Sequence, residues 1–140
     1  MSDIERAKKL LTEGGYTCVL CREDTVYKNT LRGVAPMVKW LEEGTDLVGF
    51  SAADKVIGKA AAMLFALAGV KEVHGDVMSA AAAEFLTANK VPFTCDTLTE
   101  KIINRSGDGI CPMEQLTADM NDPAAAFEAI KLKLSELRKG

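Results

Sequence analysis

The chain has 140 residues, of which 48% are hydrophobic and 26% are charged, and its formal net charge is −3. This length and composition predict one domain over residues 1–140 with its own core, and the acidic balance excludes a broad basic surface for nucleic acid. The apolar stretches are too short to cross a bilayer, and the first residues do not resemble a signal peptide, so we expect a cytoplasmic protein without membrane contact.

The N-terminal third predicts a helix, a hairpin and a second helix. Ser2 is a typical N-cap for a first helix that ends near residue 12, because a Gly-Gly pair follows. Two β-rich segments, 16–22 and 25–28, flank a short acidic turn, and this pattern predicts a β-hairpin. Pro36 then indicates the first turn of the second helix.

The centre of the chain is typical of a parallel strand–helix–strand unit. We expect an apolar strand at 46–50, a polar turn at 51–54, an Ala-rich helix to Leu67 and a second strand at 70–78. Nearly continuous apolar strands on either side of a helical segment are characteristic of parallel sheets.

A second helix and a third strand follow this unit. Ser79 is a typical cap for a helix over 80–89, and residues 91–95 predict a short strand whose proline places it at a sheet edge. Right-handed crossovers make the three strands parallel. Together with the hairpin, the pattern predicts an α/β fold: a three-layer mixed sheet of about five strands.

The C-terminal tail is predicted to be a helical cover on the same core. Residues 98–105 predict one or two helical turns, Cys111-Pro-Met-Glu114 opens a short helix, and Asp122-Pro123 begins a last helix. The tail therefore belongs to the same domain.

The order helix, hairpin, helix, strand, helix, strand, helix, strand resembles the cytidine-deaminase-like fold. Residues 50–62, Gly69-Val70, and Ile103-Asn-Arg105 followed by Cys111-Pro-Met-Glu114 also resemble a small bacterial family, the domain-of-unknown-function family 1893. This resemblance implies a deaminase-like fold that has lost its metal motif.

The motif of an active zinc deaminase is missing from the chain. Such an enzyme needs a His or Cys ligand with a Glu at one helix start and a Pro-Cys-x-x-Cys pair at the next. The corresponding stretches are Arg32-Gly-Val-Ala-Pro36 and Ser51-Ala-Ala-Asp54, and neither offers a soft ligand. We therefore expect no bound metal, no other cofactor and no deaminase activity.

The predicted ligand site lies where the parallel strands end and helices begin, as in other open α/β sheets. Its residues are Arg32, Gly33, Ser51, Asp54, Lys55, Lys59, Asn104, Arg105 and Glu114. Free N–H groups at a helix start and the two lysines suit a small anionic ligand such as a nucleotide. The structural alternative is that Ser51 or Asp54 caps the helix and that the lysines are solvated.

Cys111 supports the alternative hypothesis of an enzyme. A thiol at a helix start is a candidate nucleophile, which indicates acyl, sulfur or redox transfer. The structural alternative is that Cys111, Pro112 and Glu114 only form the start of a helix.

Two further patterns have structural interpretations beside functional ones. Cys18 and Cys21 form a C-x-x-C, but on a strand they point to opposite faces, so we expect free thiols there. His74, the single histidine, shares a strand face with Asp76, which allows either proton transfer or a structural hydrogen bond.

The small residues of 60–68 permit close helix packing, from which we expect a homodimer.

Overall fold

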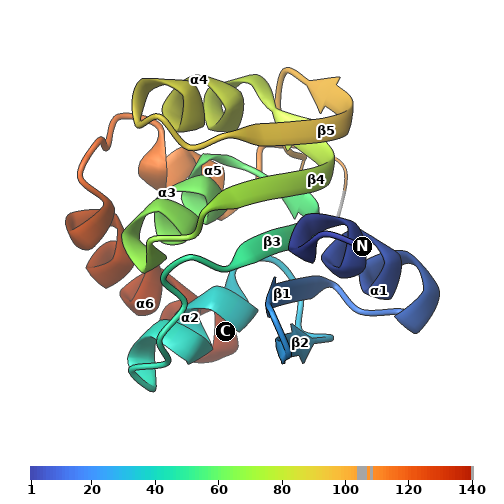
Figure 1. The fold of residues 1–140 in the computed structure, drawn as a ribbon. Coiled ribbons are helices and arrows are strands. Elements are labelled where there is room, and N and C mark those ends of the chain that lie inside the picture. Colours follow the sequence, from blue (N-terminus) through green and yellow to red (C-terminus); the bar gives the residue numbers. More distant parts are fainter. Residues whose placement is uncertain (104–106, 108, 140) are drawn as a thin grey trace.

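A five-stranded mixed sheet in the order β2-β1-β3-β4-β5 forms the centre of the fold (Figure 1). This computed structural model describes residues 1–103, 107 and 109–139. The strands are β1 (Cys18–Arg22), β2 (Thr25–Asn29), β3 (Ser51–Ile57), β4 (Glu72–Ser79) and β5 (Phe93–Thr99). Strands β3, β4 and β5 run parallel, and β1 is antiparallel to both of its neighbours. The predicted α/β class, hairpin and parallel strands are confirmed.

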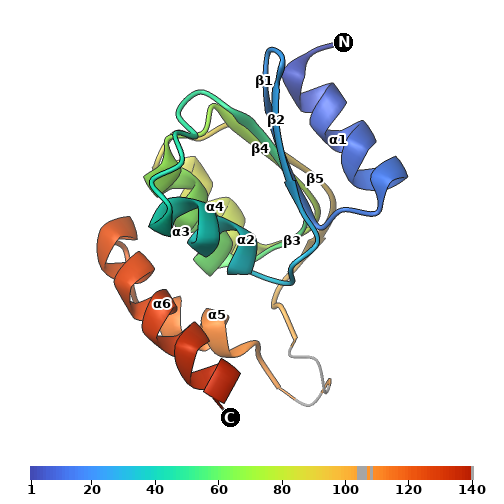
Figure 2. The same ribbon diagram turned by 90° about the horizontal axis from the view of Figure 1, so that it is seen from below.

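Six helices lie in the described part of the chain. They are α1 (Asp3–Gly14), α2 (Ala35–Glu42), α3 (Lys59–Ala68), α4 (Ala80–Ala88), α5 (Pro112–Thr117) and α6 (Pro123–Lys139). Helix α1 covers part of one face of the sheet, whereas α2, α3 and α4 cover the other, with α5 and α6 packed outside them (Figure 2). None of the described helices is long and apolar enough to span a membrane.

The sheet separates two hydrophobic clusters. The smaller one lies under α1, and its buried members are Ala7, Leu11, Val19, Cys21 and Ala53. The larger one lies between the sheet and the other helices, and it includes Cys18 and Leu20. Alternate residues of β1 therefore enter different clusters, which confirms that Cys18 and Cys21 point to opposite faces. All four cysteines are free.

The central strand lies five residues further along the chain than predicted. Residues 46–50 form a turn in which the Asp46 side chain accepts the N–H of Val48, and Gly49 has a φ of 78°. The predicted turn at 51–54 is instead the buried first half of β3. Small side chains fit this central strand between α1 and α3, so packing outweighs their weak strand preference.

The prediction of helical turns at 98–105 is also wrong for the residues that the structure describes. Leu98 and Thr99 pair with Met78 and Ser79 of β4, and Ile103 forms an isolated antiparallel bridge further on. Hydrogen bonding to a neighbouring strand thus outweighs the local helical spacing.

Ser79 caps α4 as predicted, and its hydroxyl oxygen accepts the N–H of Ala82 at 3.1 Å in a buried position. We expect Ser79→Ala to lower the free energy of unfolding by about 1–2 kcal/mol, because it leaves a buried N–H without a partner. Ser2→Ala, at the exposed cap of α1, is the matched control and should cost about 0.5 kcal/mol. Urea unfolding of both variants measures the difference, and equal losses would contradict the role of burial.

Candidate functional site

The start of α3 binds a carboxylate of the same chain. Glu114 in α5 accepts hydrogen bonds from the backbone N–H groups of Lys59 at 2.8 Å and Ala60 at 3.1 Å, one with each carboxylate oxygen. First-turn N–H groups have no partner within the helix, and the positive end of the helix dipole favours a negative charge. A side chain from the C-terminal cover therefore caps a helix of the central layer.

Gly58 leaves the space that the Glu114 carboxylate occupies. A Cβ at position 58 would collide with the carboxylate carbon and both oxygens of Glu114. The backbone at Gly58 has a φ of −94°, which any residue adopts, so a larger residue here would displace the Glu114 carboxylate without straining the backbone. The Nζ of Lys59 donates to the carbonyl of Ala118 at 3.0 Å, which adds a second link between α3 and the end of α5.

Three of the predicted site residues lie in β3 instead of at a helix start. Ser51 and Asp54 are buried, and the Ser51 hydroxyl donates to the Glu72 carboxylate at 2.7 Å. Lys55 is exposed on the same strand. Because α3 begins at Lys59, the prediction that Ser51 or Asp54 caps this helix is wrong.

The structure brings Lys59 and Glu114 together at the start of α3. Arg32 and Gly33 lie in the turn before α2, where the Arg32 carbonyl accepts the N–H of Ala35. The predicted ligand residues Asn104 and Arg105 lie outside the described residues. The sequence thus selected both residues of this contact, Lys59 of α3 and Glu114 of α5, but did not predict that they bind each other.

Cys111 is the N-cap residue of α5, and its carbonyl accepts the N–H of Glu114 at 2.9 Å. The predicted helix start is therefore confirmed. The thiol is half-buried. A nucleophilic role for Cys111 stays a prediction.

Asp54 is a carboxyl group 5% exposed within the sheet. Desolvation by burial raises its pKa from 3.8 to about 8, and the charge of Asp76 acts in the same direction. The N–H groups of Lys55 and Val56 and the thiol of Cys18 lower the pKa by smaller amounts. Burial also raises the pKa of the Cys18 thiol, so both groups of this pair are neutral at pH 7.

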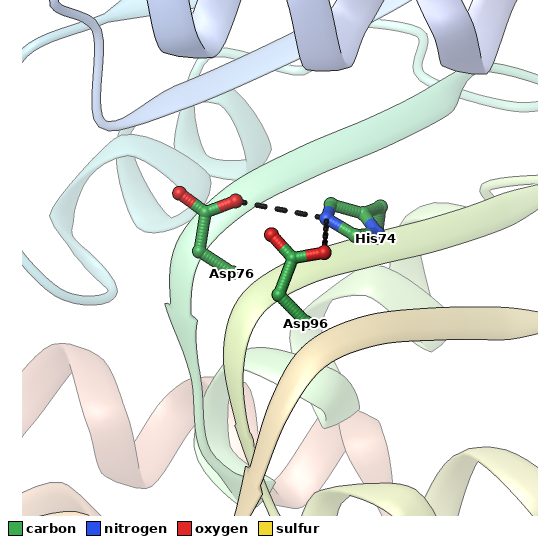
Figure 3. A group of neighbouring side chains, drawn as sticks. All are labelled: His74, Asp76 and Asp96. Atoms are coloured by element: carbon green, nitrogen blue, oxygen red, sulfur yellow. Dashed lines mark ion pairs between the residues drawn. The ribbon is translucent and has the colours of Figure 1, made fainter.

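Three side chains of β4 and β5 converge on the sheet face that α1 partly covers (Figure 3). The Nε2 atom of His74 lies 3.6 Å from Oδ1 of Asp76 and 3.7 Å from Oδ1 of Asp96. His74 is registered with Ala53, a member of the cluster under α1, which places the group on this face. On the same face, Thr94 Oγ1 lies 2.7 Å from Nδ1 of His74.

Burial increases from solvent toward the histidine of this group. The side chains of Asp96 and Asp76 are 68% and 36% exposed, whereas that of His74 is 3% exposed. Helix α1 lies mainly over β1 and β3 and also contacts β4, so this face is most open toward β5 (Figure 2). The predicted shared face of His74 and Asp76 is confirmed, and Asp96 is an additional neighbour that the sequence analysis missed.

Comparison with known proteins places the chain in a family. A family model described as "Domain of unknown function (DUF1893)" matches residues 6–134. The chain belongs to the DUF1893 family. A crystal structure of a DUF1893 family protein from Thermotoga maritima is similar with a TM-score of 0.86 at 22% sequence identity, covering 95% of this chain and 91% of that chain. None of the curated proteins matches the chain.

The DUF1893 assignment confirms the family resemblance that the sequence indicated. At 22% identity the likeness to the solved structure shows a common fold. The description of the DUF1893 family gives no activity.

Proposed function

We propose that this DUF1893 domain is a cytidine-deaminase-like scaffold that binds a small anionic ligand, such as a nucleotide, and catalyses no deamination. The element order α1-β1-β2-α2-β3-α3-β4-α4-β5 supports the proposal, because it follows the helix, hairpin and alternating helices and strands of that fold. The α/β class of the fold and the DUF1893 assignment are consistent with this proposal.

The residues at the two relevant helix starts argue against deaminase chemistry. Helix α2 begins at Val34-Ala35-Pro36 and α3 begins at Gly58-Lys59-Ala60, so neither start offers a His or Cys side chain. A zinc deaminase needs such ligands at both positions. Helix α3 begins later in the chain than the sequence predicted, but its actual start also lacks zinc ligands. We therefore still expect no deaminase activity.

The observation that carries the proposal is the Glu114 carboxylate on the N–H groups of Lys59 and Ala60. These donors, the helix dipole and the space above Gly58 together suit an anionic group. A ligand carboxylate or phosphate satisfies the same donors when it replaces Glu114. We therefore place the ligand's anionic group at the start of α3, beside Lys59.

The test is a thermal-shift titration with inorganic phosphate and with AMP. In Glu114→Ala the N–H groups of Lys59 and Ala60 lose their internal acceptor, so we expect these anions to raise the melting temperature of this variant more than that of the wild type. Glu84→Ala, at an exposed position of α4, makes the same charge change elsewhere and should respond like the wild type.

Absence of stabilisation in the wild type and in Glu114→Ala at millimolar anion would contradict the proposal. Glu114→Met keeps a side chain of similar size without an acceptor and serves if the alanine variant does not fold. An assay of ammonia release from cytidine, with and without added Zn²⁺, should give no activity, and turnover would refute the proposed loss of deaminase chemistry.

The homodimer and the cytoplasmic location remain predictions. The structure removes the argument given for the dimer, because the small residues of α3 pack against α4 and α6 within the chain. A sedimentation measurement of mass decides the oligomeric state directly.

A further inference from the structure

We propose that His74, Asp76 and Asp96 together bind one divalent transition-metal ion on the open part of the α1 face. The three ligating atoms lie within 4.8 Å of one another and come from two adjacent parallel strands (Figure 3). This site is separate from the start of α3, which lies on the other side of the sheet (Figure 2). The proposed metal site and the proposed anion site can therefore be tested independently of each other.

The orientation of His74 is the observation that distinguishes this group from an ordinary acidic patch. Its side chain is 3% exposed, and its Nδ1 atom is paired with the Thr94 hydroxyl at 2.7 Å. Among the described residues, Nε2 has no hydrogen-bond partner and points between the two carboxylates. When Nδ1–H donates to Thr94, Nε2 carries the lone pair that a metal ion requires.

The distances suit an ion better than direct hydrogen bonds. The 3.6 Å and 3.7 Å separations from Nε2 to the carboxylate oxygens exceed the range of hydrogen bonds. Ligands about 2.1 Å from a tetrahedral ion lie about 3.4 Å apart. The Asp96 side chain is 68% exposed, so it has room to rotate toward an ion held by the other two ligands.

The charge and ligand types indicate which ion fits. Two carboxylates and a neutral imidazole carry a charge of −2, which a divalent cation neutralises. Imidazole nitrogen favours first-row transition metals over Mg²⁺ or Ca²⁺, and a given site binds Zn²⁺ more tightly than Mn²⁺ or Fe²⁺. With three protein ligands on an open face, the ion keeps at least one position for water or another ligand.

The experiment is a Zn²⁺ titration of chelator-treated protein, followed by calorimetry and by NMR of the histidine ring. His74 is the single histidine of the chain, so its ring resonances report on this site alone. We expect binding of one Zn²⁺ per chain together with a shift of the His74 resonances. Binding through cysteine alone would leave these resonances unchanged.

Two variants connect the binding to the proposed ligands. Asp96→Asn removes an exposed ligand on the edge strand, and we expect it to weaken Zn²⁺ binding by more than ten-fold. Asp24→Asn, in the exposed hairpin turn, makes the same charge change and should bind Zn²⁺ like the wild type. Thr94→Val removes the partner of His74 Nδ1, and we expect an affinity on the order of 10–100-fold lower.

Three results would overturn the proposal: no Zn²⁺ binding, binding that leaves the His74 resonances in place, or equal affinity of Asp96→Asn and the wild type. In each case the histidine and the carboxylates form only a structural ion-pair group. Circular dichroism of the variants confirms that they are folded before their affinities are compared.

Discussion

Asp54→Asn is expected to make the protein more stable than the wild type at pH 8, with a gain that grows steadily from pH 4. The carboxyl group of Asp54 has a pKa raised from 3.8 to about 8 because burial disfavours its charged form. The asparagine amide has nearly the same size and does not ionise. This variant therefore isolates the cost of keeping the carboxyl group protonated in the fold.

The direction of the pH dependence follows from proton binding. Between pH 4 and pH 8, Asp54 is protonated in the folded state and ionised in the unfolded state, so unfolding releases a proton. The stability contribution is fully present below pH 3.8 and is lost as the pH rises through the folded pKa of about 8. The total loss is on the order of 6 kcal/mol, from about 1.4 kcal/mol per pKa unit.

Urea unfolding of the wild type and Asp54→Asn between pH 4.5 and pH 8.5 measures this effect as the difference between two curves. Ionisable groups that do not interact with Asp54 contribute equally to both proteins, so the difference belongs to position 54 and the groups beside it, Cys18 and Asp76. Asp24→Asn at an exposed position should follow the wild-type curve. Parallel curves for the wild type and Asp54→Asn would show that the buried carboxyl group does not cause the pH dependence of stability.

Gly58→Ala is expected to lower the free energy of unfolding by about 2–3 kcal/mol, although its backbone suits alanine. The new Cβ would occupy the position of the Glu114 carboxylate, which then leaves the N–H groups of Lys59 and Ala60. Loss of hydrogen bonds to a charged acceptor accounts for a cost of about this size. Without that contact, a glycine in extended conformation would be replaced by alanine with a small gain.

A double-mutant cycle tests the explanation. In the Glu114→Ala background the carboxylate is absent, so Gly58→Ala should cost nothing or stabilise slightly. Urea unfolding of the four proteins gives the coupling energy between positions 58 and 114. An undiminished cost of Gly58→Ala in the Glu114→Ala background would mean that the collision lies elsewhere.

The carboxylate that caps α3 illustrates what local sequence reasoning misses. The sequence predicted an external anion at the start of this helix, with Lys59 and Glu114 among its ligand residues, whereas the anion found there is Glu114 itself. Glu114 lies 55 positions from Lys59, and its approach depends on how α5 packs over α3. The sequence contains no periodic signal for such a contact.

The His74 group in the sheet likewise depends on a contact that the sequence did not predict. Strand alternation alone placed His74 and Asp76 on one face. Asp96 joins them because β5 pairs with β4 in a register that aligns His74 with Thr94. Thr94 and Asp96 are polar residues two positions apart near the predicted third strand. This pattern indicates a shared strand face, but it does not indicate which strand lies beside that face.

The sequence by itself determined the α/β class, the hairpin, the order of helices and strands from α1 to β5, the capping residues Ser2 and Ser79, and the DUF1893 family. These features depend on hydrophobic spacing and on hydrogen bonds within a few residues, which the chain encodes locally. The tertiary structure decided that 51–54 is a buried strand, that Asp54 stays protonated near neutral pH, and which side chains meet Glu114 and His74. Those properties arise from desolvation and from contacts between distant segments, and only the packed fold brings such segments together.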